Sequence, residues 1–262
     1  MKVLNGFYKT AFFFRDHVSK YKIFDNKESF LNWVEENAGH HGGYYLALNP
    51  EKIFAASKDK NLNRILKTAQ GLIVDGVGAK LAIQYVLSKK YDRVTGVDAM
   101  LSVLQVAQEK GLRVGFFGAK KHVLEKVKKV VEREYSGVRA VFFLSGYGED
   151  KASVSQVLTN HPVDIVFVAL GSPEQEKWID RIIDQYPDVI FTGVGGSFDV
   201  LSGKFLEASV AASNWNGMVL SIFIGTKKNV PKDVGFVTVR VDGFKGKKCL
   251  KKYLFALVHD QT

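Results

Sequence analysis

Two apolar segments in the second half of the chain end in turns of small residues, and this pattern restricts the folds available to it. Residues 165–170 (IVFVAL) are followed by GSP, and residues 189–191 (VIF) are followed by TGVGGS. Between them, residues 174–185 have the spacing of an amphipathic helix. A strand that ends in glycine beside the start of a helix is typical of parallel α/β sheets, and it places backbone N–H groups where they can bind an anion.

Short apolar runs and helical segments alternate through most of the remaining chain. Further strands are expected at residues 44–48, 72–74, 114–117 and 140–144, and further helices at 29–37, 79–87, 97–109, 123–134 and 152–158, with one or two helices at 51–69. This alternation predicts an α/β fold, a Rossmann-like parallel sheet with helices on both faces. We assign this domain to residues 1–203 and expect residues 204–262 to form an atypical C-terminal tail that is partly disordered.

The charge balance points to an anionic partner. The 262 residues carry 37 Lys and Arg against 27 Asp and Glu, a net charge of +10, and such an excess favours nucleotides, lipid phosphates or nucleic acid. The single cysteine, Cys249, excludes an internal disulfide and a cysteine-based zinc site. No apolar run reaches the roughly 18 residues of a membrane span, so we expect a cytoplasmic protein that contacts membranes only peripherally, at the inner face of the plasma membrane.

Small or polar residues follow nearly every predicted strand. They include Asn49, Asp75, Gly118, Tyr147, Gly171, Gly195 and Gly196. In open parallel sheets, ligands bind beyond the carboxyl ends of the strands. One such turn can simply end a strand, but six together predict a ligand site along this edge, to which Gln175 and Asp199 add polar groups. A nucleotide diphosphate is the ligand that we expect there.

Three residues of this edge have both a functional and a structural interpretation. Asp75 can act as a general base at a partly desolvated strand end, or it can cap the helix that follows or shape the turn. Arg93, next to Thr95, can bind a phosphate, or it can form a surface ion pair with Asp92 or Asp98. Tyr147 can stack on a nucleobase, or it can pack within its own turn.

Several ligand classes lack their usual sequence signals. No Gly-x-Gly-x-x-Gly follows a strand and no Walker loop is present, which argues against NAD and ATP. No Asp-x-Asp occurs, and the six histidines show no metal-ligand spacing apart from the adjacent His40 and His41. We therefore expect no metal site and no cofactor. Aromatic and basic residues are not interleaved as in nucleic-acid-binding motifs, so nucleic acid is not an expected partner.

Six sequence blocks, taken in order, resemble the WecG/TagA/CpsF glycosyltransferases. They are LNPEKIFAA (48–56), IVDGVGAKLA (73–82), DRVTGVDAM (92–100), VGFFGA (114–119), LGSPEQEKWI (170–179) and GVGGSFDVLSG (193–203). The family contains N-acetylmannosaminyltransferase-type enzymes of bacterial surface-polysaccharide and wall-teichoic-acid synthesis. Six blocks in family order make the resemblance specific, and it covers most of the chain up to Gly203.

The resemblance implies an inverting, metal-independent hexosyltransferase. It would move an N-acetylmannosamine-type sugar from a UDP donor to N-acetylglucosamine on undecaprenyl pyrophosphate. The resemblance assigns Asp75 as the general base, and Asn49, Arg93, Thr95 and Gln175 as substrate-binding residues. Nucleotide-binding positions would be Gly118, Tyr147, Gly171, Gly195, Gly196 and Asp199. It also implies work at an anionic membrane surface and favours self-association as a homo-oligomer.

The chain departs from the family pattern after Gly203. Family members continue with a basic stretch and an arginine-rich helical appendage, whereas residues 204–262 show no such pattern. Codons permitted by this tail, read one nucleotide forward, yield a string that resembles the appendage, with a tryptophan forced at Met218-Val219. We therefore hypothesise a frameshift near Lys204, which sequencing of the DNA at this point would decide.

A second departure lies within the first block, where Ala47 stands at a position that is threonine in many members. A lost hydroxyl removes one hydrogen bond, about 1 kcal/mol. Together with the altered tail, this change favours an alternative, a catalytically impaired protein that binds a nucleotide sugar. The presence of Asp75 favours the enzyme.

Overall fold

The computed structural model describes residues 17–203 together with the segments 220–225, 234–241 and 251–258. The first part contains six strands: β1 (Gly43–Leu48), β2 (Gly71–Val74), β3 (Arg113–Gly118), β4 (Arg139–Leu144), β5 (Ile165–Ala169) and β6 (Ile190–Gly193). Its helices are α2 (Lys27–Asn37), α3 (Pro50–Ala56), α4 (Lys60–Thr68), α5 (Val77–Leu87), α6 (Gly96–Lys110), α7 (Lys121–Glu134), α8 (Glu149–Asn160), α9 (Glu174–Ile182) and α10 (Ser197–Leu201), and a 3₁₀ turn (Ile183–Gln185) extends α9.

The six strands form one parallel sheet with the order β2-β1-β6-β5-β3-β4. β6, the last strand of this domain along the chain, lies at the centre, where Gly193 is in register with Leu46 of β1 and Val168 of β5. Because all six strands are parallel, their carboxyl ends meet at one edge of the sheet. The predicted α/β class and strand positions are therefore confirmed.

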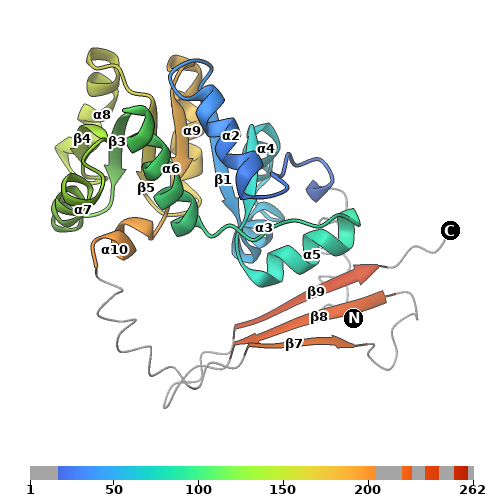
Figure 1. The fold of residues 1–262 in the computed structure, drawn as a ribbon. Helices are drawn as coiled ribbons and strands as arrows, with labels where there is room; N and C mark the ends of the chain where they lie inside the picture. The colour runs from blue at the N-terminus through green and yellow to red at the C-terminus, as the bar shows by residue number, and fades with distance from the viewer. Residues whose placement is uncertain (1–16, 204–219, 226–233, 242–250, 259–262) are drawn as a thin grey trace, which may run out of the picture.

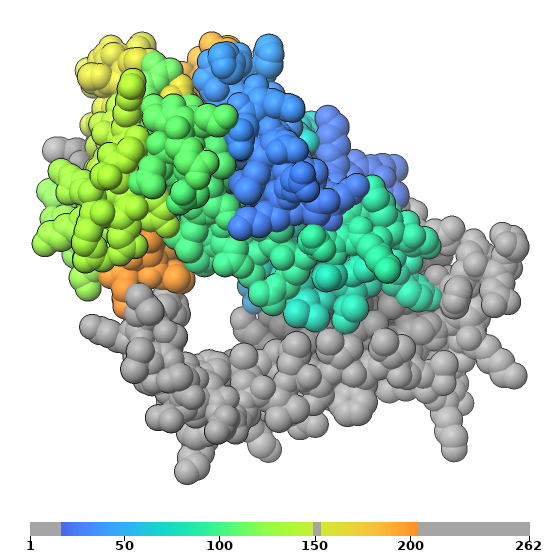
Figure 2. Space-filling view, viewed as in Figure 1, coloured from blue at the N-terminus to red at the C-terminus, as the bar shows by residue number. Residues whose placement is uncertain are grey.

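Helices cover both faces of the sheet (Figure 1). The first core is formed with α3, α4, α5, α8 and α9, and it contains Leu62, Ile65 and Ile179. The second is formed with α2, α6, α7 and α10, and it contains Phe30 and Leu104. Figure 2 shows α2, α6 and α7 on the surface over this second face. Burial of apolar side chains on both faces explains why the strands read as continuous apolar runs.

Local signals in the chain set where several helices begin and end. Asn26 and Ser29 form a capping box at the start of α2, in which Oδ1 of Asn26 accepts the N–H of Ser29 at 2.8 Å. Thr95 caps α6, and the helix ends at Gly111, which adopts a left-handed φ of 62°. The start of α6 lies next to the end of β2, where an isolated parallel bridge joins Val74 to Arg93.

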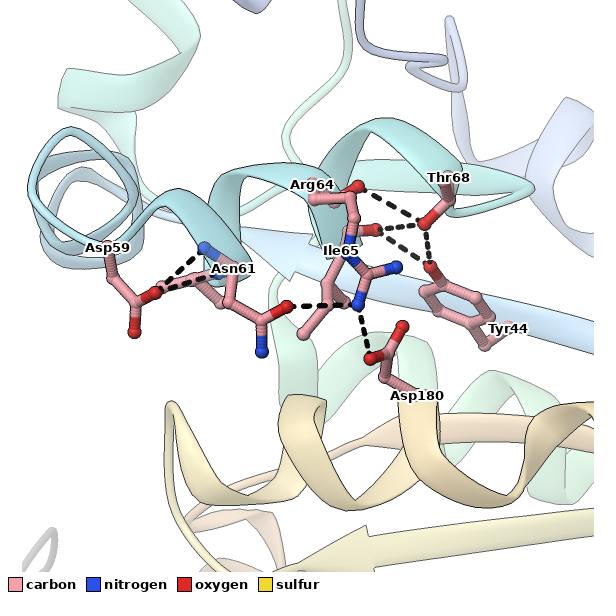
Figure 3. A network of polar contacts seen from close by, with 8 residues as sticks. Tyr44, Asp59, Asn61, Arg64, Ile65, Thr68 and Asp180 are labelled. Carbon is pink, nitrogen blue, oxygen red and sulfur yellow. Dashed lines mark hydrogen bonds and ion pairs between the residues drawn. The ribbon is translucent and has the colours of Figure 1, made fainter.

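A polar network holds α4 against β1 and α9 (Figure 3). The buried Tyr44 hydroxyl on β1 donates to the carbonyl of Ile65 at 2.8 Å and lies 2.6 Å from the Thr68 hydroxyl. Arg64 on α4 forms an ion pair with Asp180 on α9. A second ion pair joins Lys177 of α9 to Asp59, the N-cap of α4, at 3.0 Å. The two ion pairs join α4 to the outer face of α9, whose first turn faces the sheet edge.

The described part of the C-terminal tail consists of three strands, β7 (Leu220–Gly225), β8 (Val234–Val241) and β9 (Lys251–Val258). They form an antiparallel sheet in the order β7-β8-β9. The frameshift hypothesised near Lys204 lies outside the described residues and stays a prediction. In the portion that the structure covers, no helix is both long and apolar enough to cross a membrane.

Candidate functional site

The six polar or glycine-rich turns predicted from the sequence lie at one edge of the sheet. From one side to the other, this edge carries Asp75 after β2, Asn49 after β1, the β6 loop (residues 193–197), Gly171 after β5, Gly118 at the end of β3 and Tyr147 after β4. Asp75 and Tyr147 stand at opposite ends, five strand spacings or about 24 Å apart along the sheet. Only a ligand that extends along the edge can contact both.

Asp75 lies directly beyond β2 and is half-buried. Its backbone N–H donates to the carbonyl of Leu48 at 3.0 Å. Its carboxylate accepts a hydrogen bond from the N–H of Gly96, in the first turn of α6. The helix that follows Asp75 has Gly76 at its N-cap and no side-chain cap, so Asp75 does not cap α5. The carboxylate is thus held by a helix N-terminus from another part of the chain.

Opposing effects act on the ionisation of Asp75. Burial raises the pKa of its carboxyl group above the ordinary value, while the N–H of Gly96 and the charges of Arg93 and Lys52 act in the opposite direction. Asp98, in the first turn of α6, adds a further raising effect. The net pKa is raised, and a carboxylate with a raised pKa is a stronger base once it is ionised.

The segment around Arg93 runs beside the end of β2. Val94 donates its N–H to the carbonyl of Val74 at 3.0 Å, and an isolated parallel bridge joins Val74 to Arg93. The Arg93 side chain is exposed, and among the described residues it forms no ion pair with Asp92 or Asp98. Its guanidinium remains available for an anion at the edge.

Thr95 and Asn49 both act as helix caps in this structure. Oγ1 of Thr95 accepts the N–H of Asp98 at 3.1 Å, and Oδ1 of Asn49 accepts the N–H of Lys52 at 2.8 Å. These bonds use the side-chain oxygens, as N-caps do. The amide nitrogen of Asn49 has no hydrogen-bond partner among the described residues, so it is the part of this side chain that can serve a ligand.

Gln175 is buried, and both ends of its amide are bonded within the protein. Oε1 accepts the N–H of Gly195 in the β6 loop at 3.0 Å, and Nε2 donates to Oε1 of Glu176 at 3.0 Å. A Cβ at Gly193 would lie 2.5 Å from Nε2, so only glycine leaves room for this side chain. Gln175 therefore anchors the β6 loop to the start of α9, and its role as a direct sugar contact stays a prediction.

A buried ion pair lies behind Gln175. Nζ of Lys52, in the first turn of α3, lies 2.7 Å from Oε1 of Glu176, and the two side chains are 4% and 0% exposed. Burial alone would raise the pKa of Glu176, but the charge and hydrogen bond of Lys52 outweigh it, with help from Gln175 and Ser172, so this pKa is lowered.

This pair was missed from the sequence. Glu176 lies three residues before Ile179 and one after Gln175, and the buried positions of α9 also include Trp178 and Ile182. That helical spacing was a signal that Glu176 lies on the buried face. Nothing comparable marked Lys52, whose partner comes from a distant segment.

The predicted nucleotide-binding glycines fall into two groups. Gly118 has a φ of 114°, and a Cβ there would lie 2.4 Å from the carbonyl oxygen of Ala169, so this glycine allows β3 and β5 to approach closely. Gly171 and Gly196 have no atom within 4 Å of such a Cβ, and at Gly195 the nearest atom is 4.0 Å away. Open space of this kind along the edge can accommodate part of a ligand.

The remaining predicted residues lie on either side of these glycines. Tyr147 is 64% exposed, and its N–H donates to the Ser145 hydroxyl at 3.3 Å, so its ring is not packed within its turn. Asp199 lies in α10 and is half-buried. Across the part of the chain that the structure describes, no three His, Cys, Asp or Glu side chains are grouped as metal ligands would be.

Three segments of the edge meet at Gly96. A Cβ at this position would lie 3.8 Å from Cβ of Ala47, 3.9 Å from Oδ2 of Asp75 and 4.0 Å from Oγ of Ser197. The ends of β1 and β2 and the β6 loop therefore surround the first turn of α6. Asp75, Asn49 and Arg93 belong to this half of the edge, and Tyr147 to the other.

Comparisons with known proteins show the family to which the chain belongs. A family model described as "Glycosyl transferase WecG/TagA/CpsF family" matches residues 17–220. A protein of Bacillus subtilis strain 168 is 32% identical over 185 residues, which cover 70% of this chain and 72% of the relative. A protein of Bacillus spizizenii strain W23 is 33% identical over 167 residues, which cover 64% and 65%. Both relatives are named N-acetylglucosaminyldiphosphoundecaprenol N-acetyl-beta-D-mannosaminyltransferase. The chain thus belongs to the WecG/TagA/CpsF family of glycosyl transferases.

Proposed function

We propose that this protein transfers an N-acetylmannosamine-type sugar from a UDP donor to the N-acetylglucosamine of an undecaprenyl-diphosphate-linked acceptor. The names of the two relatives support the sugar and the acceptor. The observation that carries the proposal is the Asp75 carboxylate, held half-buried by the N–H of Gly96 at the edge of a parallel sheet. The row of open glycine turns beside it supports a nucleotide donor.

In the proposed reaction, Asp75 is the general base. Its ionised carboxylate accepts the proton of the acceptor hydroxyl while the hydroxyl oxygen attacks the anomeric carbon of the donor sugar. The bond from that carbon to the diphosphate breaks, and UDP leaves with the bonding electrons. A single displacement of this kind inverts the configuration at the anomeric carbon.

The negative charge that develops on the departing diphosphate needs positive partners. Arg93 is exposed, and its charge acts to lower the pKa of Asp75. In the proposal its guanidinium binds a phosphate, for which its planar geometry is suited. The N-termini of the helices that begin at this edge supply further backbone N–H groups. With these groups the proposed transfer proceeds without a metal ion.

The proposed acceptor is a lipid, so the reaction would take place at a membrane surface. We propose that the protein associates peripherally with the inner face of the plasma membrane, where its excess of positive charge favours anionic lipids. Sedimentation with vesicles that contain anionic lipids, compared with neutral vesicles, tests this association. Equal binding to both kinds of vesicle, binding to the anionic vesicles that added salt does not weaken, or no binding to either kind would argue against it.

One assay tests the transfer directly. The protein is incubated with UDP-N-acetylmannosamine and a GlcNAc-pyrophosphoryl-lipid analogue, and UDP release is followed for the wild type and for Asp75→Asn. Release by the wild type alone supports the proposal. UDP binding without release by either protein supports the alternative of a nucleotide-sugar-binding protein. Asp180→Asn, which removes a carboxylate from the outer ion pair of α9, is the control and should retain release.

A further inference from the structure

The buried ion pair between Lys52 and Glu176 has no part in the mechanism above. Taking two charges out of water costs several kcal/mol per ion, and their attraction seldom recovers more than this cost. Both side chains are almost fully buried, at 4% and 0% exposure, so neither can contact a substrate without rearrangement. A pair of this kind beside a catalytic edge calls for a role other than stability.

The contacts of Glu176 connect three of the turns at that edge. Its Oε1 bonds Lys52, in the helix that follows β1, and Nε2 of Gln175. Glu176 itself lies in the first turn of α9, directly after the turn that follows β5, and its Oε2 is buried with no hydrogen-bond partner among the described residues. Through Gln175 the connection continues to the N–H of Gly195 in the β6 loop. Glu176 thus sets the positions of the turns after β1, β5 and β6 relative to one another.

Lys52 also acts on Asp75. The charged groups that affect Asp75 are Arg93, beside the end of β2, Lys52 of α3 and Asp98 of α6. Of the two positive groups, Arg93 has the larger effect on Asp75 but is exposed, whereas Lys52 is buried. Solvent screens the charge of a buried lysine much less than that of an exposed arginine. The ion pair with Glu176 holds this ammonium group in a fixed position.

On the basis of the proposed function, we infer that Lys52 and Glu176 are positioning residues of the transfer reaction. They hold Gln175 against the β6 loop and keep in place a positive charge that acts on Asp75, and they do so without touching the substrate. Gln175 then links the β6 loop to the ion pair, so the position of this loop and the charge that acts on Asp75 depend on the same two residues.

Three variants separate this role from a purely structural one. In Glu176→Gln, Lys52 loses its counter-charge, and its positive charge should favour ionised Asp75 more strongly. In Lys52→Met the positive charge is gone, and ionised Asp75 is disfavoured. Lys52→Met/Glu176→Gln removes both charges while the glutamine can still accept from Gln175, so this variant should fold even where a single variant does not.

The readout is the acidic limb of the pH profile of kcat/KM for UDP release. The expected order of its midpoint, from low to high pH, is Glu176→Gln, wild type, the double variant and Lys52→Met. The midpoints of Glu176→Gln and Lys52→Met should differ by about half a pH unit or more. Asp180→Asn changes a carboxylate to an amide on the same helix, in a more exposed pair, and should keep the wild-type midpoint. Shifts of the single variants in the same direction, or an unshifted double variant, would overturn the inference.

A second measurement separates this inference from the proposed function. The carboxyl carbon of Asp75 is followed by ¹³C NMR across the acidic pH range in the same proteins, with Asp75→Asn used to assign the signal. If the wild type releases no UDP, the proposed function fails, yet the same order of titration midpoints would still support the inference. Identical midpoints in all variants would refute it whatever the activity.

Discussion

Asp75 is subject to two opposing requirements at the scale of a single residue. A general base must be ionised to accept a proton, but the half-buried position of Asp75 favours the neutral form and raises its pKa. The N–H of Gly96 and the charges of Arg93 and Lys52 reduce this effect without removing it. A site that keeps such a carboxylate ionised near neutral pH gives up some stability for reactivity.

Replacing Asp75 by asparagine should therefore lower activity and raise stability. We expect kcat for UDP release to fall by about 10²–10⁴-fold, and Tm at pH 7 to increase. Because the folded pKa of Asp75 is raised, its protonated form stabilises the fold below the unfolded pKa, and this stabilisation is lost as the pH rises through the folded pKa. The Tm difference should thus be small near pH 3 and larger at pH 7. An activity loss with a lower Tm at both pH values would contradict this explanation.

Gly193 provides a second prediction at this scale. A methyl group at this position would lie 2.5 Å from Nε2 of Gln175, so Gly193→Ala should displace that side chain and, with it, the β6 loop. We expect KM for the UDP sugar to rise by about tenfold or more, since misplacement of a binding loop by an ångström has effects of this size.

A double-mutant cycle checks whether the effect acts through Gln175. Gln175→Ala removes the group that the new methyl would meet, so adding Gly193→Ala to it should change KM little further. If the two effects simply multiply, the displacement of Gln175 is not the cause.

At the scale of elements, ion pairs fix the segments from which the edge is built. Arg113, at the start of β3, and Asp164, directly before β5, join two neighbouring strands at the end opposite to the site. Oδ2 of Asp164 accepts the N–H of Arg113 at 2.7 Å and Nε of its side chain at 3.1 Å. Burial would raise the pKa of Asp164, but these hydrogen bonds and the charge of Arg113 lower it overall.

Asp164→Asn should destabilise the protein by about 1–2 kcal/mol at pH 7, because it weakens charge-assisted hydrogen bonds to a group that stays buried. The folded pKa of Asp164 is lowered, so its contribution is present above the unfolded pKa and is lost as the pH falls through the folded pKa. Urea unfolding at several pH values should show the gap to the wild type closing toward pH 3. Asp180→Asn, whose pair is more exposed, should show a smaller effect. An equal gap at all pH values would argue against this account.

Most elements were predictable from the sequence because their local signals were strong. The apolar runs of β1, β3 and β5 and the helical spacing of α6 and α7 predicted them within a few residues. The short helix α10 was not predicted, since its 5 residues follow directly on a glycine-rich turn. For Asp75, the strand end was evident from the sequence, but its hydrogen bond from Gly96 was not, because that contact depends on how α6 returns to the sheet.

At the scale of the whole molecule, the order of the strands in the sheet could not be predicted from the sequence. A parallel sheet produces the same alternation of strands and helices for any order, and only the fold places β6 between β1 and β5. This order brings the β6 loop beside Asn49 and lets Gln175 reach Gly195. It also brings Lys52 and Glu176 together from distant parts of the chain. For this reason their ion pair could not be predicted from the sequence.

From the sequence we place the end of the α/β domain at Gly203, and a pair of truncated chains tests this boundary. If residues 1–203 are the folding unit, a chain that ends at Gly203 should unfold cooperatively in urea, with a free energy of unfolding within about 1 kcal/mol of the full chain. A chain that ends at Gln185 also loses β6, which pairs with both β1 and β5, and it should not unfold cooperatively. If the chain ending at Gly203 instead behaves like the one ending at Gln185, residues beyond 203 are part of the folding unit, and the domain boundary proposed at this glycine is wrong.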